Sequence, residues 1–380
     1  MTTYDVAVIG GGPAGYGAAR DIAAERRRVL VLEEHEQAGE PLQCSGLVSP
    51  HTLELAGVSN SVVLNRLKGA IVYAPSGNTL KLKGNRTLAL AIDRPAFERE
   101  LYRQALEAGV EVSFSTRITG LEDTPGALKI ISNNLENGIK AHLVIGADGA
   151  NSAVARCRGL FLPGEVITMY AAEVYLPSRE TELAEIYLGN QLAPGWFGWV
   201  IPLDQNHARV GIGSARKSTS ASSCFQLLLK TYPERFKELK IIKPTGGIVV
   251  LGFHSRTYGP RVMLVGDAAR QNKPLSGGGL HPGLKAARCC AQVALQALAK
   301  GDFSEKMLSR YQTMWEKEIG HEIKHGLKNR KIFASLSDSR MELIIRFLNR
   351  PFWKSLILNQ ANLDQTAKLA GRLVTLISRF

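Results

Sequence analysis

The sequence lacks the features that mark several classes of protein. Its five cysteines, at positions 44, 157, 224, 289 and 290, are an odd set without a C-x-x-C pair, which argues against a disulfide framework and a structural zinc site. No apolar run approaches the roughly 18 residues that cross a bilayer. The start, MTTYDVAVIGGG, has neither the basic nor the long apolar segment of a secretory signal. We expect a cytoplasmic protein without a metal, at most peripheral to a membrane.

Acidic residues are scarce toward the C-terminus of this basic chain. The 380 residues carry a formal net charge of +13, and residues 321–380 hold 11 Lys and Arg against 4 Asp and Glu, a net charge of +7. A basic tail suggests an anionic partner, either a nucleic acid or a membrane surface. No recognised nucleic-acid-binding motif accompanies the charge, so we expect no nucleic acid partner.

A βαβ unit is predicted at the start of the chain. Runs rich in β-branched residues and Leu predict strands over 5–9 and 29–33, and a helical period predicts a helix over about 13–25. The turn between the first strand and the helix reads GGGPAG. This order of strand, glycine turn, helix and strand is typical of a dinucleotide-binding fold.

Each glycine of the turn has a physical role in such a fold. Gly10 permits the tight turn, Gly12 lets a pyrophosphate approach the N-terminus of the helix that Pro13 and Ala14 begin, and Gly15 lets helix and strand pack closely. Glu33, at the end of the second strand, can accept a hydrogen bond from a ribose hydroxyl. The alternative is a glycine-rich turn that only packs.

The later part of the chain falls into a strand-rich region and a helical region. Residues 165–260 read as antiparallel strands interrupted by one helix over 222–236, and the last 80 residues read as helical. We predict an α/β (α+β) fold with a Rossmann-type nucleotide-binding domain, an antiparallel-sheet domain and a C-terminal helical region. The nucleotide-binding domain is predicted to comprise residues 1–60, 90–160 and 261–300. The antiparallel-sheet domain comprises residues 61–89 and 161–260, and the helical region comprises residues 301–380.

Two further motifs carry acidic and glycine residues. The first, VIGADGANSAVAR, contains Asp148, and the second, VMLVGDAARQNKPLSGGGLHPG, contains Asp267 and the triple glycine 277–279. Asp267 can bind a ribityl or ribose hydroxyl, or merely cap the following turn. The triple glycine lets backbone lie against a flat ring and opens a helix whose dipole favours negative charge on that ring.

The order of these motifs resembles that of the FAD-dependent enzymes of the aromatic-hydroxylase fold, over roughly residues 3–300. Within that group the sequence is most similar to the geranylgeranyl reductase family, whose P-x-x-C segment is matched by PLQC, residues 41–44. The resemblance implies FAD as cofactor and a polyprenyl chain, on a lipid, quinone or related isoprenoid, as substrate. The FAD contacts that it implies fall on Gly10, Gly12, Pro13, Ala14, Gly15, Glu33, Cys44, Ser45, Leu47, Arg94, Asp148, Asp267, Gly278, Gly279 and Leu280.

The family's Y-x-W-x-F-P-K substrate motif is only approximated here. Residues 197–203 read FGWVIPL, so Trp199 and Pro202 match, while Phe197, Ile201 and Leu203 replace Tyr, Phe and Lys. The resemblance implies that Phe197, Trp199, Ile201 and Pro202 line the substrate channel. The same stretch resembles the W-x-W-x-I-P motif of flavin-dependent halogenases, with its first Trp displaced to Trp196. An oxygen-using hydroxylase or halogenase is therefore the first alternative.

Reduction of an isolated alkene needs a hydride from flavin N5 and a proton for the other carbon. The site should be apolar, exclude water and present an aromatic face to the developing charge. Cys44 and His281 are the candidate proton donors. Packing is the alternative for Cys44 and a structural role for His281. No second nucleotide fold is visible, so NAD(P)H must bind transiently or a ferredoxin must deliver electrons. An electron carrier from ferredoxin to quinone is the second alternative.

The basic tail contains an amphipathic segment. Ser339 and Glu342 form a capping-box pattern, and an apolar stripe follows with basic residues interleaved. Such a helix can lie on an anionic membrane, where prenyl lipids reside. The alternative is that these helices pack on the FAD domain with solvated basic faces. The stripe consists of Met341, Ile344, Ile345 and Leu348 and is continued by Phe352, Trp353, Leu356 and Ile357.

Overall fold

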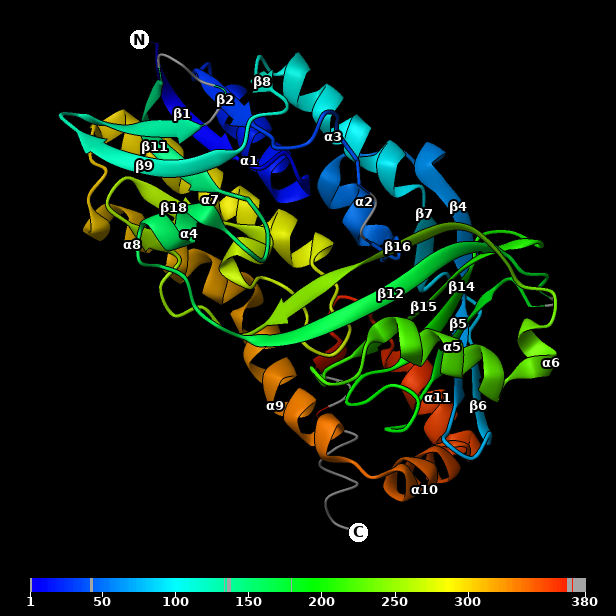
Figure 1. Cartoon of the computed structure of the whole chain (residues 1–380). Helices are drawn as coiled ribbons and strands as arrows, with labels where there is room; N and C mark the ends of the chain where they lie inside the picture. The colour runs from blue at the N-terminus through cyan, green and yellow to red at the C-terminus, as the bar shows by residue number, and fades with distance from the viewer. Residues whose placement is uncertain are drawn as a thin grey trace.

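A computed structural model describes residues 2–41, 44–132, 134, 138–178, 180–367 and 371 (Figure 1). Its first layer is an eight-stranded sheet whose central strands are parallel, in the order β18-β11-β1-β2-β8, with the antiparallel β17 at one edge and the β9–β10 hairpin on β11. The strands are β1 (Thr3–Ile9), β2 (Val29–Leu32), β8 (Glu111–Ser113), β9 (Ile118–Thr124), β10 (Ala127–Ser132), β11 (Ile139–Gly146), β17 (Tyr258–Gly259) and β18 (Val262–Leu264).

The predicted βαβ unit is confirmed. Helix α1 (Pro13–Ala23) joins β1 to β2 and packs between α3 (Arg94–Glu107) and α7 (Leu280–Lys300). All four residues of β2 and the last four of β1 are buried, because helices cover one face of the parallel sheet and the β9–β10 hairpin with α4 (Ala153–Cys157) covers the other.

A seven-stranded sheet forms the second layer, in the order β16-β12-β15-β14-β13-β5-β6. All its neighbouring strands are antiparallel except β5 and β13. Helix α5 (Ala221–Thr231) covers one face of this sheet, and the other face is turned toward the first layer. The strands are β5 (Gly69–Tyr73), β6 (Thr79–Lys83), β12 (Glu165–Tyr175), β13 (Leu183–Tyr187), β14 (Gly198–Pro202), β15 (His207–Ser214) and β16 (Lys240–Leu251).

The single helix predicted over 222–236 is wrong in one respect. Helix α5 ends at Thr231 and a separate short helix, α6 (Pro233–Phe236), begins at Pro233. Proline has no N–H to continue the hydrogen-bond ladder, and it disfavours helical backbone in the residue before it. Tyr232 accordingly adopts φ −122° and ψ 61°.

A small three-stranded sheet connects the two layers. Strand β7 (Ala89–Ile92) lies between β3 (Leu47–Val48) and β4 (Val63–Leu67). Helix α2 (Pro50–Ala56) follows β3 and packs against α7. This arrangement brings the segment around Cys44 to the junction of the two large sheets.

The C-terminal region is helical, as predicted, with α8 (Glu305–Trp315), α9 (His321–Ser335), α10 (Asp338–Leu348) and α11 (Pro351–Gln360). The predicted capping box is wrong, because the Ser337 side chain caps α10 by accepting from Arg340 N–H. Glu342 instead accepts hydrogen bonds from Ser76 and Asn78 in the β5–β6 turn.

Much of the apolar stripe of the tail packs inside the molecule, although Phe352 is 69% exposed. Ile345, Leu348 and Ile357 are buried against Leu80 of β6 and its neighbours. Helices α10 and α11 therefore pack on the edge of the antiparallel sheet and not on the layer of the parallel sheet, where the sequence-based alternative would place them. Among the described residues no helix is long and apolar enough to cross a membrane.

Candidate active site

The glycine turn after β1 can be built only with glycine at two positions. Gly10 has φ +104°, and a Cβ there would lie 2.4 Å from the carbonyl oxygen of Ala147. A Cβ on Gly15 would lie 2.1 Å from Gly10 O, so α1 rests directly on the turn. At Gly12, by contrast, no described atom lies within 4 Å of the Cβ position. The space beside Gly12 is open at the N-terminus of α1, where Pro13 is the first residue and no described side chain caps the helix.

Glu33 lies beside this turn with its carboxylate fixed. One carboxylate oxygen accepts from Gly11 N–H at 2.6 Å, and the other accepts from His35 N–H at 2.9 Å. Glu33 is 9% exposed, so its carboxylate is already oriented before any ligand arrives. That position, at the end of β2, is the one the sequence predicts for a ribose contact.

The two aspartates of the later motifs have different surroundings. Asp148 Oδ2 accepts from the N–H groups of Ala153 and Val154 at 2.6 and 3.0 Å, so it holds the start of α4. No described residue pairs with its buried Oδ1, and burial raises the pKa of this carboxyl group. Asp267 accepts from Asn272 Nδ2 at 3.1 Å, and burial raises its pKa as well.

The triple-glycine loop, Gly277 to Gly279, brings the two layers of the fold together. A Cβ on Gly279 would lie 3.2 Å from Asp267 Oδ1, on the side of the parallel sheet. A Cβ on Gly277 would lie 3.4 Å from Met169 Cε and 3.6 Å from Trp196 Cζ2, on the inner face of the antiparallel sheet. Leu280 then begins α7. The loop therefore separates a polar, acidic side from an apolar, aromatic side.

The Cys44 segment lies beside Arg94 at the start of α3. Arg94 is buried and forms an ion pair with Glu98. Burial would lower the pKa of the guanidinium, but Glu98 and Cys44 raise it above its usual value. No described residue pairs with Arg94 Nε or Nη1. Arg94 therefore brings positive charge and two donor nitrogens without a described hydrogen-bond partner to the segment after the P-x-x-C match.

Sequence reasoning missed Arg209, which fixes this segment to the antiparallel sheet. Its Nη1 donates to the carbonyl oxygens of Ser45 and Ile92 at 3.1 and 2.8 Å, and its Nε lies 3.4 Å from Glu173 Oε2. Arg209 is 5% exposed. The signal in the sequence was a single arginine within the apolar strand HARVGIGS, since a buried arginine needs partners.

The predicted substrate residues lie on the inner face of the antiparallel sheet. Trp199 and Ile201 alternate along β14 and belong to one apolar cluster with Trp196 and Leu203, while Val200 points to the opposite face and packs under α5. Phe197 stacks on Trp196, with ring centroids 5.1 Å apart. Leu47 packs against the same cluster, and Pro202 O accepts a hydrogen bond from Asn65.

Two glycines of β15 make room for the indoles, and this role was not predicted. A Cβ on Gly211 would lie 2.3 Å from Trp199 Cζ2, and a Cβ on Gly213 would lie 2.2 Å from Trp196 Cδ1. Both indoles therefore lie directly against the backbone of β15. The spacing of two residues in VGIGS was the available signal, because residues i and i+2 of a strand share a face.

The two candidate proton donors have distinct environments. His281 is 9% exposed in the first turn of α7, with Nδ1 3.6 Å from Asp364 Oδ1, and its ring centroid is 5.5 Å from that of His51. Burial lowers the pKa of His281 to about 4, against the opposing effect of Asp364. Cys44 is a free, half-buried thiol whose Sγ accepts from Gly46 N–H at 3.4 Å.

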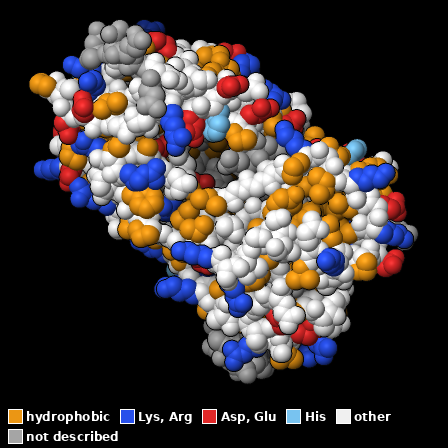
Figure 2. Space-filling model, in the orientation of Figure 1, with side chains coloured by type: hydrophobic (Ala, Val, Ile, Leu, Met, Phe, Trp, Pro, Cys, Tyr) orange, Lys and Arg blue, Asp and Glu red, His pale blue; other side chains and the backbone are white. Residues whose placement is uncertain are grey.

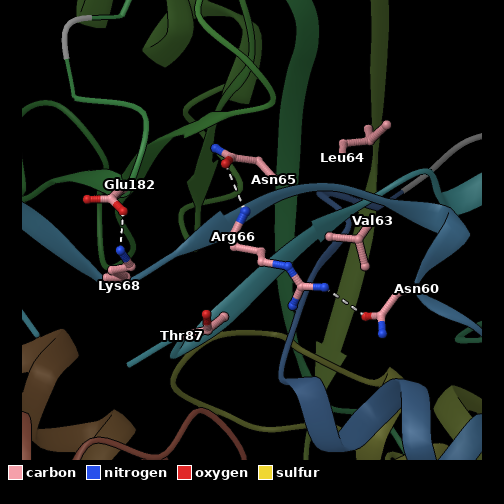
Figure 3. A pocket seen from close by; sticks show the side chains of 8 residues that line it. All are labelled: Asn60, Val63, Leu64, Asn65, Arg66, Lys68, Thr87 and Glu182. Carbon is pink, nitrogen blue, oxygen red and sulfur yellow. Dashed lines mark hydrogen bonds and ion pairs between the residues drawn. The ribbon is translucent and has the colours of Figure 1, made fainter. Parts of the chain in front are cut away.

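The surface is hollowed between the half that contains β1 and α1 and the antiparallel sheet, as Figure 2 shows. A separate polar hollow of about 450 Å³ lies beside β4 (Figure 3). Arg66 and Lys68 point into it and are paired with Asn60 and Glu182. None of the predicted site residues lines this second hollow, so we do not assign the cofactor or the alkene to it.

The residues of the first site fit FAD. The open space at Gly12 and the uncapped N-terminus of α1 suit a pyrophosphate, and Glu33 suits a ribose. The unpaired donors of Arg94 and the unpaired Asp148 Oδ1 are buried polar atoms that a bound polar ligand would satisfy.

Comparison with known proteins agrees with this geometry. The FAD binding domain family matches residues 3–317. Digeranylgeranylglycerophospholipid reductase 2 of Methanopyrus kandleri is 30% identical over 98% of this chain and 96% of its own length. The corresponding reductase of Methanosarcina acetivorans is 31% identical over 93% of this chain and 90% of its own length. The chain belongs to the geranylgeranyl reductase family of FAD-binding proteins.

The family and its cofactor, both predicted from the sequence, are thereby confirmed, and this geranylgeranyl reductase family member binds FAD. A solved structure of a geranylgeranyl bacteriochlorophyll reductase-like protein from Thermoplasma acidophilum has a TM-score of 0.86 and 26% identity, covering 98% of this chain and 100% of that one. A flavin-dependent brominase has a TM-score of 0.71 at 17% identity, covering 99% of this chain and 100% of that one. The likeness to the brominase shows the fold alone.

Proposed function

We propose that this protein is an FAD-dependent reductase that saturates C=C bonds of geranylgeranyl chains on a glycerophospholipid. The observation that carries the proposal is the apolar, aromatic face that the antiparallel sheet presents to the triple-glycine loop. The names of the relatives from Methanopyrus kandleri and Methanosarcina acetivorans support the lipid as the substrate class.

The apolar wall suits a prenyl chain in its chemistry. Its buried members come from four strands of the antiparallel sheet. They include Ile167 and Ala171 of β12, Ala184 of β13, Trp199 and Ile201 of β14, and Leu251 of β16. An isoprenoid chain offers only apolar surface, so its transfer from water to this wall is favoured in proportion to the area buried. The face of Trp199 carries negative π charge, which stabilises cationic character on an alkene carbon that accepts a proton.

Bound FAD, once reduced, supplies the hydride. The protein positions the alkene, excludes water from it and donates the proton. Arg209 holds Ser45, the neighbour of Cys44, at the junction of the sheets, and the buried Arg94 places positive charge beside this segment. The apolar wall excludes water from the reacting carbons. We propose Cys44 or His281 as the proton donor, with Trp199, Phe197, Ile201 and Pro202 lining the channel.

The electron donor is proposed to be NAD(P)H, bound transiently, or a ferredoxin. The βαβ unit at Gly10 to Glu33 is assigned to FAD, and the sequence shows no second unit of this kind. Stopped-flow reduction of the bound flavin by NADPH, NADH and a reduced ferredoxin distinguishes the donors, because the competent donor bleaches the oxidised flavin at a rate that saturates with its concentration.

We further propose that the protein works at an anionic membrane surface, which it contacts through the exposed end of β16. Ile241 and Ile242 are 45% and 55% exposed there, and Lys240 and Lys243 flank them. Figure 2 shows hydrophobic side chains gathered over β12 and β16 beside the hollow. Exposed apolar residues bordered by lysines suit the head-group region of anionic lipids. The part of the tail's apolar stripe formed by Ile345, Leu348 and Ile357 does not serve this purpose, since it is buried against β6, whereas Phe352 is 69% exposed.

Mass spectrometry of the lipid tests the proposed activity. The FAD-loaded protein is reduced with dithionite and incubated with digeranylgeranyl glycerophospholipids. The proposal expects a mass gain of two hydrogens for each double bond reduced. Unchanged lipids together with oxygen consumption coupled to another substrate would favour a monooxygenase or halogenase. Quinone reduction without any change in prenyl mass would favour an electron carrier.

A further inference from the structure

A buried charged cluster lies beneath the triple-glycine loop, and part of it comes from the C-terminal end of the described chain. Lys273 Nζ donates to Leu363 O at 2.7 Å and lies 3.7 Å from Asp364 Oδ1. The side chains of Lys273 and Asp364 are 8% and 9% exposed. Charged groups this deeply buried are costly unless they are paired, so the pair is a built feature of the fold.

Lys273 is directly attached to the loop that it supports. Its backbone N–H donates to Gly278 O at 3.1 Å, its carbonyl oxygen accepts from Gly277 N–H at 2.8 Å, and its Cε lies 3.0 Å from the Cβ position of Gly278. The ammonium group is therefore held against the underside of the loop, close to the N-terminus of α7.

Asp364 is held in place by groups other than Lys273. Ser49, which caps α2, donates from Oγ to Asp364 Oδ2 at 2.5 Å, and His281 Nδ1 lies 3.6 Å from Asp364 Oδ1. No described residue forms a hydrogen bond with Oδ1, which faces both Lys273 and His281. The charge of Asp364 is therefore directed at the base of the loop.

The segment that delivers Asp364, residues 361–367, is tied down along its length. Arg86 Nη2 donates to Ala361 O at 2.7 Å, and Leu363 packs on the apolar wall. Glu322 accepts from Thr366 Oγ1 and Ala367 N–H at 3.0 and 2.7 Å, and Asn329 Nδ2 donates to Ala367 O at 2.8 Å. This segment lies beyond residue 317, where the match to the FAD binding domain family ends.

We propose that Lys273 and Asp364 form a charge pair that sets the reduction potential of the bound flavin, and that segment 361–367 is therefore a functional part of the flavin site. The sequence predicts that the flavin ring lies against Gly277 to Gly279, the loop that Lys273 contacts. A reduced flavin carries negative charge, which a cation beneath the loop stabilises and a carboxylate opposes. In a site shielded from water these effects act over several ångströms.

Other charged or titratable groups also face the cluster. Glu322 of α9 acts on Lys273, while Lys285 of α7 and His51 of α2 act on His281. Burial lowers the pKa of Lys273, and Asp364 and Glu322 oppose this effect. Asp364 thus helps to keep Lys273 protonated while compensating its charge. Neither Lys273 nor Asp364 is proposed to touch the flavin. Both act on it across the triple-glycine loop, so they are positioning residues and not catalytic ones.

The test is the midpoint potential of bound FAD, measured by spectroscopic redox titration of the holoprotein. Lys273→Met leaves the Asp364 carboxylate uncompensated and should lower the potential. Asp364→Asn leaves the Lys273 ammonium uncompensated and should raise it. The double variant should return toward the value of the unmodified protein. Shifts of the same sign in both single variants, or no shift in either, would overturn the proposal.

Controls separate charge from folding and from the proposed lipid activity. Asp338 is a carboxylate at the start of α10 that accepts a hydrogen bond from Asn190 N–H. The control substitution Asp338→Asn should leave the midpoint potential of bound FAD unchanged. If Lys273→Met does not retain FAD, the sign of the Asp364→Asn shift alone decides, and a fall or no change overturns the proposal. The measurement rests on bound FAD and needs no alkene, so it remains decisive even if the lipid proves not to be the substrate.

Discussion

The strongest test of the apolar wall is the substitution Gly211→Ala on β15. The added Cβ would lie 2.3 Å from Trp199 Cζ2 and 2.7 Å from Ala171 Cβ. Carbon atoms pack best at about 3.5–4.0 Å, so the Trp199 indole must move by more than about 1 Å. The Ala171 methyl group sits directly on the backbone of β12 and cannot turn away. We expect a loss of about 1–3 kcal/mol in the free energy of unfolding, the usual range for overpacking.

The matched control lies on the neighbouring strand. At Gly198 the added Cβ meets Leu228 Cδ2 at 3.4 Å and Gly211 O at 3.5 Å, which are ordinary contacts. Gly198→Ala should therefore change the free energy of unfolding by no more than about 0.5 kcal/mol. Both variants are compared by denaturant unfolding of the FAD-bound protein, and the fluorescence of Trp199 should change only in Gly211→Ala.

A double-mutant cycle shows whether the indole is the cause. Trp199→Phe removes the ring that Gly211→Ala meets, so the two substitutions together should cost less than the sum of their separate costs, by about 1 kcal/mol. Prenyl reduction should fall in Gly211→Ala, because the displaced indole narrows the channel, while FAD stays bound. Additive costs, or equal stability of Gly211→Ala and Gly198→Ala, would refute this account of the wall.

Three further predictions address the cofactor and the proton donors. Glu33→Gln should weaken FAD binding roughly ten- to hundredfold by equilibrium titration, because a charged acceptor is worth about 1.5–3 kcal/mol; unchanged affinity would contradict the ribose role. Cys44→Ser should retain FAD but slow alkene reduction about a hundredfold if the thiol donates the proton, whereas the exposed-thiol control Cys157→Ser should not. Unaltered rates and products would leave Cys44 a packing residue. Burial lowers the pKa of His281 from 6.5 to about 4, so the unfolded chain binds more protons between these values and stability falls as the pH is lowered through that window. His281→Gln should reduce the stability lost between pH 7 and pH 5 by about 2 kcal/mol in denaturant titrations, and an unchanged loss would contradict the buried neutral imidazole.

The parts of the fold that could be predicted from sequence are those encoded by short, contiguous patterns. The β1-α1-β2 unit follows from hydrophobic period and glycine spacing within about thirty residues. The alternating strands of the antiparallel sheet are likewise visible locally. The errors were also local: the helix over 222–236 was not divided at Pro233, and the cap of α10 was placed at Ser339 instead of Ser337. In both cases neighbouring residues offered competing cap or turn signals.

The candidate site was only partly accessible in the same way. Gly10, Gly15 and Glu33 could be proposed as site residues because their roles depend on neighbours in the same motif. Arg209 could not, since its partners at Ser45 and Ile92 are 164 and 117 residues away. The roles of Gly211 and Gly213 depend on which indoles lie over them, which is a matter of strand pairing and not of composition.

The family, the cofactor and the class of fold could be read from the amino-acid sequence, because the residues that bind a dinucleotide must follow one another along a strand, a turn and a helix. The surroundings of the triple-glycine loop could be known only from the folded chain. Folding placed an aromatic sheet and the buried Lys273 against the loop, and it brought Asp364, which meets Ser49 across a separation of 315 residues, beside Lys273. The physical reason is that such contacts depend on the path of the whole chain, which local propensities do not specify.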